Sequence, residues 1–135
     1  MTDKTGLDPF ALASRYRALC EAGKVEGVYP QLELWGFAKT LARMGEVAFV
    51  GVEAAHPYAC VLLDIYHIFK GGSDFDGLPM FATSRMYNFH VNDYPANPPR
   101  ETIKDAQRVY PGDGVAPLGK IFRTLRDNGY RGTLS

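Results

Sequence analysis

The sequence has few cysteines, no excess of either charge and no long apolar run. Its 2 cysteines, Cys20 and Cys60, stand in apolar surroundings without the spacing of a metal site, which favours buried free thiols in a reducing compartment over a disulfide. The 15 basic residues balance the 15 acidic ones, giving a formal net charge of zero. This balance disfavours nucleic acids and membrane surfaces as partners, because both require a cationic face.

No apolar run approaches the roughly 20 residues of a membrane span. The polar residues 1–6 lack the apolar segment of a signal peptide. Apolar residues make up 46% of the chain and aromatic residues 13%, which is enough for a buried core and excludes disorder. We therefore expect a single domain over residues 1–135, soluble and cytoplasmic.

Helical and strand patterns alternate along the chain. Helices are predicted at residues 8–23, 37–48, 76–84 and 118–125. Strands are predicted at residues 31–35, 59–63 and 86–91, and from residue 132 onward. The first helix is predicted to begin at the N-cap Asp8, to bury Tyr16 and Leu19, and to end at Gly23. This alternation implies right-handed βαβ units and a parallel sheet.

Polar residues are expected at the ends of these strands. Glu33 lies in the first strand, Asp64 follows the second and His90 lies near the end of the third, with His67 three residues after Asp64. The carboxyl ends of parallel strands share one rim. Two carboxylates and an imidazole on that rim would suit a divalent cation such as Mn²⁺, Mg²⁺, Co²⁺ or Zn²⁺.

Each of these residues also has a structural interpretation. Glu33 equally suits a solvent-facing position at a sheet edge, and Asp64 alone is typical of an N-cap of the next helix. His56 precedes its strand and is interpreted as a structural residue on the opposite rim. Trp35 is typical of packing, although it stands beside Glu33 and would also line a pocket.

Four segments in this order resemble the C-terminal half of the xylose-isomerase-like TIM-barrel superfamily, which contains sugar phosphate isomerases and epimerases. They are Leu32-Glu33-Leu34-Trp35-Gly36, Asp64-Ile65-Tyr66-His67, His90-Val91-Asn92-Asp93 and Arg108-Val109-Tyr110-Pro111-Gly112-Asp113-Gly114. The resemblance implies an α/β fold of the (β/α)8 barrel type. The chain would hold about the last four βα units and would break off in the last strand.

The resemblance also implies roles for the site residues. Glu33, Asp64 and His90 would bind one divalent metal ion, and His67 and Arg108 would contact the substrate. Trp35 is expected to line the same pocket. The family has a further glutamate on its eighth strand, after the Gly-x-Leu-Ser start of that strand, and the chain ends at that start.

These residue types suit isomerisation or epimerisation next to a carbonyl. The reaction removes a proton from the adjacent carbon through an enediolate, which a metal ion stabilises. Glu33 would act as a catalytic acid/base, and a second carboxylate would serve the other face of the substrate. The substrate would be a small molecule, and the residues leave open a free sugar, a sugar phosphate or a cyclitol.

Two alternatives stay open. AP endonucleases of the same superfamily share the Asp-x-x-His and His-x-Asn-Asp elements, but they need an added Asp-x-His pair where residues 107–110 read Gln-Arg-Val-Tyr. A half barrel would leave sheet edges and an apolar face open, so the other alternative is an inactive fragment that forms homo-oligomers. With one carboxylate and half of the barrel missing, we expect the chain alone to lack turnover, to bind metal weakly and to self-associate.

Overall fold

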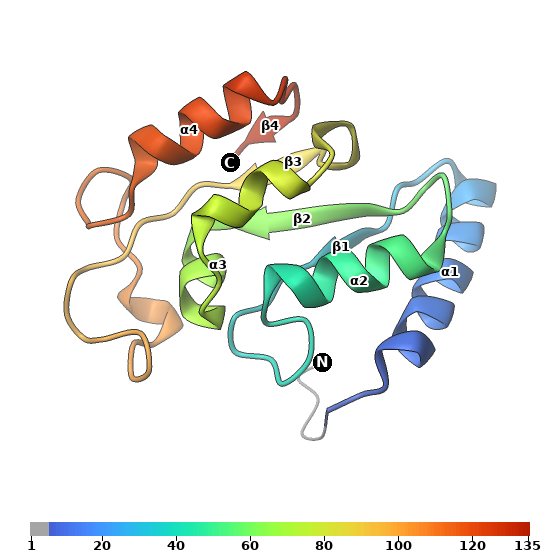
Figure 1. The fold of residues 1–135 in the computed structure, drawn as a ribbon, viewed down its shortest axis with the longest axis horizontal. Helices are drawn as coiled ribbons and strands as arrows, with labels where there is room; N and C mark the ends of the chain where they lie inside the picture. The colour runs from blue at the N-terminus through green and yellow to red at the C-terminus, as the bar shows by residue number, and fades with distance from the viewer. Residues whose placement is uncertain (1–5) are drawn as a thin grey trace.

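The computed structural model describes residues 6–135, and its centre is a parallel sheet of four strands in the order β1-β2-β3-β4 (Figure 1). The strands are β1 (Gln31–Glu33), β2 (Cys60–Asp64), β3 (Asn88–His90) and β4 (Thr133–Leu134). The α-helices are α1 (Pro9–Glu26), α2 (Met44–Ala54), α3 (Ile65–Gly71) and α4 (Leu118–Asp127). Short 3-10 turns are η1 (Phe75–Met80), η2 (Thr83–Arg85) and η3 (Asp105–Gln107). The α/β class and the parallel sheet are as predicted.

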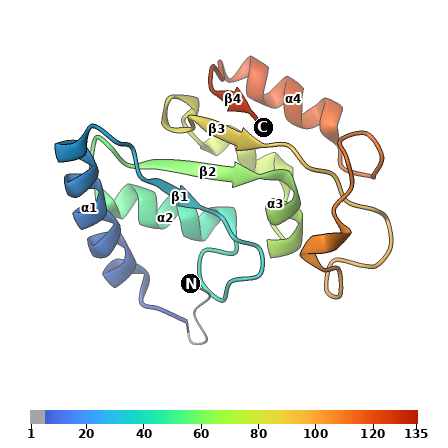
Figure 2. The same cartoon turned by 180° about the vertical axis from the view of Figure 1, so that it is seen from behind.

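The two faces of the sheet differ in character. Val61, Leu63 and Phe89 face the helices and are at most 6% exposed. The register pairs Glu33 with Leu62 and Asp64 with His90, so that these side chains share the opposite face. Figure 2 shows this second face, with β1 and β2 in front of α2. Among residues 6–135, no helix has both the length and the apolar character needed to cross a membrane.

Helix α1 begins where predicted and ends later. The Asp8 carboxylate caps it by accepting backbone hydrogen bonds, but the C-cap is Gly27, whose φ of 69° is left-handed, and not Gly23. Gly23 lies inside the helix and is buried. A Cβ there would lie 2.5 Å from the Val28 carbonyl oxygen, so only glycine fits at this position. Leu19, predicted to be buried, is 55% exposed because it lies beside the stripe that packs. That stripe consists of Ala13, Tyr16, Cys20 and Gly23.

The second predicted helix is wrong in its first half. Phe37 and Leu41 have helical spacing, but residues 34–43 form a loop in which Leu41 has a φ of 67°. Helix α2 begins at Met44, and the Glu46 side chain accepts the backbone N–H of Arg43 at 2.9 Å. A residue in the left-handed conformation cannot continue an α-helix. The helical spacing of Phe37 and Leu41 is therefore not enough to predict a helix here.

The remaining predicted elements differ mainly in their limits. Residues 65–71, for which no element is predicted, form α3, and the helix predicted at residues 76–84 is instead the pair of turns η1 and η2. Pro79 lies inside η1 and has no N–H to donate, which disfavours a longer helix. Cys20 and Cys60 are free and buried, as predicted.

The long loop between β3 and α4 is organised by the buried carboxylate of Asp93, which is 1% exposed. The Asp93 backbone pairs with Val109, the neighbour of Arg108, through two hydrogen bonds of 3.2 and 3.1 Å. Asp93 therefore fixes the part of the loop that carries Arg108. The Asp93 side chain also accepts four hydrogen bonds of 2.8 to 3.2 Å, from the backbone N–H groups of Tyr94, Gly112, Gly114 and Ala116.

Asp93→Asn should lower the free energy of unfolding by about 1–3 kcal/mol at pH 7, since an amide nitrogen cannot accept the N–H groups. Burial raises the pKa of Asp93, but the four backbone hydrogen bonds outweigh it and hold that pKa below its usual value. The stabilisation is therefore present above the unfolded pKa of about 3.9 and is lost as the pH falls through the lower folded pKa. Urea denaturation from pH 7 to pH 2 measures both effects.

The matched control is Asp113→Asn in the same loop, at an exposed position. It should change the free energy of unfolding by no more than about 0.5 kcal/mol. Equal stability of Asp93→Asn and the parent at pH 7 would contradict the role given to Asp93.

Candidate active site

His67, His90 and Arg108 meet at Asp64, where β2 ends and α3 begins. The Asp64 side chain is 1% exposed, and its Oδ1 accepts the backbone N–H of His67 at 3.1 Å. Its Oδ2 accepts the side-chain amide of Asn92 at 2.8 Å. Asp64 is therefore the N-cap of α3, as its structural interpretation expected, and also the polar centre of the rim.

His90 reaches the same carboxylate from the neighbouring strand. Its Nδ1 lies 3.6 Å from Asp64 Oδ2, and the two residues are register partners in the sheet. This separation is too long for a hydrogen bond, so neither atom is committed to the other. The His90 side chain is 38% exposed and can be reached from the second face of the sheet.

Glu33 lies on the same face of the sheet but apart from this pair. It is the register partner of Leu62, which precedes Asp64 by two residues, or about 7 Å along the strand. Its side chain is exposed on strand β1. Within residues 6–135, no three His, Cys, Asp or Glu side chains lie close enough together to hold a metal ion. The structure thus brings together two of the three predicted ligands and leaves the third on the adjacent strand.

The chemistry of these donors fits a divalent cation. Asp64 and Glu33 offer carboxylate oxygens, and His90 offers an imidazole nitrogen, a mixture suited to Mn²⁺, Mg²⁺, Co²⁺ or Zn²⁺. The buried charge of Asp64 faces an uncommitted nitrogen on the same side of the sheet. Asp64 and His90 are the two of these donors that the structure brings together.

His67 is buried beside this pair, with 1% of its surface exposed. The centroid of its ring lies 4.1 Å from that of Trp35 and 6.0 Å from that of Phe37, so aromatic rings wall it. Its Nδ1 is buried without a hydrogen-bond partner in the structure. Burial lowers the pKa of His67 below its usual value, although the Asp64 carboxylate opposes the shift. Burial therefore disfavours the charged form of His67, and its Nδ1 is left without a protein partner.

Arg108 approaches Asp64 from the long loop. Its Nη1 lies 3.5 Å from Asp64 Oδ2, and its Nη2 lies 2.7 Å from Asp105 Oδ1. The guanidinium carbon is 5.2 Å from the centroid of the Tyr66 ring. Arg108 and His67 thus both adjoin the Asp64–His90 pair.

Sequence reasoning gave no role to three residues that the structure brings here. Asn92 and Tyr66 lie inside the motifs given above, so membership of these motifs could have marked them as candidate site residues. Asp105 precedes Arg108 by three residues, a spacing that joins side chains within one turn. His56 is buried in contact with Glu21, at 3.2 Å, in the segment before β2, which agrees with its structural interpretation.

Two glycines let the loop after β1 pack against α3. A Cβ at Gly36 would lie 2.7 Å from the carbonyl oxygen of His67, and a Cβ at Gly71 would overlap the carbonyl oxygen of Ala42. This close approach seats Trp35 on His67. The aromatic wall of the site therefore depends on backbone contacts that only glycine permits.

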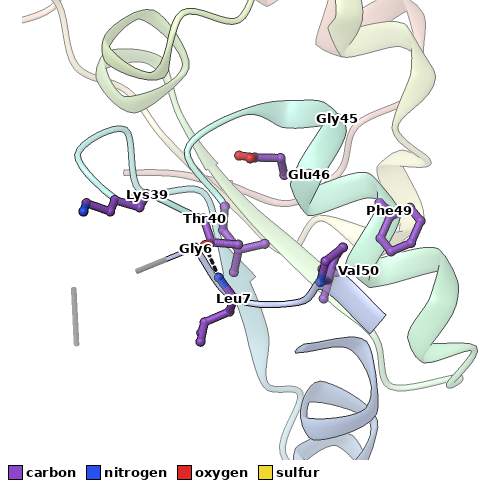
Figure 3. Close-up of a pocket in the computed structure, with 10 residues that line it drawn as sticks. Gly6, Leu7, Lys39, Thr40, Gly45, Glu46, Phe49 and Val50 are labelled. Atoms are coloured by element: carbon purple, nitrogen blue, oxygen red, sulfur yellow. Dashed lines mark hydrogen bonds between the residues drawn. The ribbon is translucent and has the colours of Figure 1, made fainter. Parts of the chain in front are cut away.

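A separate cavity of about 410 Å³ lies between residues 6–9, the loop after β1 and helix α2 (Figure 3). The Leu7 N–H donates to the Thr40 hydroxyl at 3.1 Å, and Phe49 contributes an apolar wall. None of the six predicted site residues is among its described lining. The arrangement of polar groups, and not the size of a cavity, identifies the candidate site.

The fold and the rim residues define an α/β chain of barrel type. A sequence model described as xylose isomerase-like TIM barrel matches residues 8–135, and the chain belongs to this family. The resemblance seen in the sequence is therefore confirmed.

Individual relatives agree with this assignment. Inosose isomerase from Halalkalibacterium halodurans is 29% identical over 118 residues, which are 87% of this chain and 42% of that protein. The crystal structure of the IolI protein with a bound zinc atom matches with a TM-score of 0.91 and 18% identity, over 100% of this chain and 50% of that one. The 3-keto-D-glucoside 4-epimerase YcjR from E. coli matches with a TM-score of 0.73 and 18% identity, over 99% and 48%. The chain spans about half the length of these relatives.

Gly71→Ala should push the loop after β1 away from α3 and separate Trp35 from His67. Overpacking of this kind costs about 1–3 kcal/mol of stability. Because Trp35 is the single tryptophan, its emission should shift to longer wavelength as the indole becomes hydrated. Fluorescence spectra and thermal unfolding measure both changes.

Gly45→Ala is the matched control, because a Cβ at that position of α2 would meet nothing within 4 Å. It should leave the emission spectrum of Trp35 unchanged. If the Gly71→Ala protein kept the emission spectrum and the stability of the parent, the packing of the loop after β1 against α3 would not depend on Gly71.

Proposed function

We propose that this chain supplies metal-binding and substrate-binding residues of an isomerase or epimerase that acts on a sugar or a cyclitol. The observation that carries the proposal is the Asp64–His90 pair at the carboxyl rim of the sheet, with His67 and Arg108 beside it. Family membership and a relative named inosose isomerase support the same class of reaction. We also propose that residues 1–135 form one domain, the last four βα units of a barrel.

In this proposal Glu33 is the acid/base that moves a proton on the carbon next to the substrate carbonyl. It is exposed on the face that Asp64 and His90 share, so its carboxylate is free to reach a substrate bound there. Positioned general bases contribute about 10²–10⁴ to the rate. Returning the proton to the other face of the carbon requires a second acid/base group.

His67 and Arg108 hold substrate oxygens. Arg108 brings a positive charge, and His67 brings a ring nitrogen that has no protein partner. Together they offset the negative charge that develops on oxygen when the proton leaves. Trp35 keeps water away from one side of the His67 ring.

Asp64 and His90, with Glu33, would hold a divalent cation. When bound, that cation supplies Lewis-acid polarisation of the substrate carbonyl and its neighbouring hydroxyl. The buried position of Asp64 strengthens its attraction for a cation, since little water lies there to screen the charge.

The proposal predicts proton exchange next to a ketone. In D₂O with Mn²⁺, a version of the chain extended at both ends should introduce deuterium next to the carbonyl of a ketose or an inosose-like ketone. Glu33→Gln should lower the exchange rate by about 10²–10⁴. NMR of a panel of ketoses and cyclitol ketones measures the exchange.

Glu53→Gln, an exposed position on α2, makes the same chemical change away from the site and should exchange like the parent. Exchange that survives Glu33→Gln undiminished would remove Glu33 from the reaction. A parent protein that exchanges no ketone of the panel would overturn the proposed class of reaction.

A further inference from the structure

Arg108 lies between two carboxylates, and the proposed function uses only one of them. Its Nη2 donates to Asp105 Oδ2 at 2.8 Å and lies 2.7 Å from Asp105 Oδ1, whereas its Nη1 is 3.5 Å from Asp64 Oδ2. The contact with Asp105 is therefore the tighter one.

The local chain holds Arg108 on the Asp105 side. Asp105 begins the turn η3, and the backbone N–H of Arg108 donates to the Asp105 carbonyl at 3.2 Å, so the two side chains leave the same turn. The Tyr66 ring lies 5.2 Å from the guanidinium carbon and supports one face of it. The Arg108 side chain is 27% exposed, and its Nη1 also makes a long hydrogen bond of 3.5 Å to Asp64 Oδ2.

The carboxylate oxygens of Asp64 have little hydrogen-bonding capacity left. Its Oδ1 accepts the His67 N–H, and its Oδ2 accepts the Asn92 amide at 2.8 Å and the Arg108 Nη1 at 3.5 Å. A metal ligand must keep an electron pair for the cation. A full bidentate ion pair with Arg108 would occupy both oxygens, and burial would make such a pair hard to break.

We propose that Asp105 is a positioning residue that limits Arg108 to one long contact with Asp64 and keeps it from forming a full bidentate ion pair there. Asp105 thereby leaves the Asp64 carboxylate available to a divalent cation and keeps the Arg108 guanidinium near the substrate pocket. This inference rests on the proposed function, because it requires a cation site at Asp64 and His90.

Asp105→Asn tests the inference in the 135-residue chain, because it keeps the size of the side chain and removes its charge. Mn²⁺ affinity, measured from the EPR signal of the free ion, should fall about tenfold, the lower end of what outer-shell substitutions cost. Asp105→Glu keeps the carboxylate and should restore most of the affinity. Asp127→Asn removes an exposed charge on α4 and should leave the affinity unchanged.

A double-mutant cycle with Arg108→Ala separates positioning from simple charge or folding effects. If Asp105 acts through Arg108, Asp105→Asn should have no effect on Mn²⁺ affinity once Arg108 is absent. An equal loss of affinity with and without Arg108 would overturn the inference, since the effect would then come from the charge of Asp105 or from the turn itself.

The failure of this inference is distinguishable from the failure of the proposed function. A parent chain that binds Mn²⁺ with an affinity that Asp105→Asn does not alter would overturn the inference alone. A parent chain that binds no Mn²⁺ would overturn both.

Discussion

The carboxylate of Asp64 is almost fully buried, and a buried charge must be compensated by the groups around it. The compensating groups come from separate parts of the chain. The first turn of α3 supplies the His67 N–H, and the segment after β3 supplies the amide of Asn92. The long loop supplies the guanidinium of Arg108. The requirement of one buried charge thus holds the start of a helix, a strand end and a distant loop at the same rim.

A second buried carboxylate makes this meeting possible. Asp93 gathers backbone N–H groups from a loop of more than twenty residues and pairs with Val109, which sets the position of Arg108 beside it. On the other side of the site, the close contact of Gly36 and Gly71 places Trp35 on the ring of His67. The candidate site is therefore built on backbone geometry as much as on its own side chains. In α/β barrels, functional residues on the rim loops are likewise positioned by the rigid scaffold beneath them.

Sequence reasoning predicted the parts of the fold that depend on strong local patterns. The apolar run before Asp64 predicts a buried parallel strand, and the strand ends place Asp64 and His90 on one rim. Local patterns failed where tertiary packing decides. Phe37 and Leu41 have helical spacing, yet the close contact with α3 holds them in a loop.

The detail of the site was also only partly predictable. The motifs contained Asn92, but no spacing indicates that its amide binds Asp64, because that contact depends on how the chain turns after β3. The separation of Glu33 from Asp64 follows from the strand register, which pairs Glu33 with Leu62. A register is a property of two strands together, and neither strand pattern alone specifies it.

Asp64 and His90 are proposed to belong to one divalent-cation site. Crystals of the chain grown with Mn²⁺ test it most directly, because the anomalous scattering of manganese locates the ion without prior assumptions. We expect an anomalous peak within about 2.0–2.3 Å of an Asp64 oxygen and a His90 nitrogen. A peak bonded to other residues, with Asp64 and His90 left uncoordinated, would contradict it.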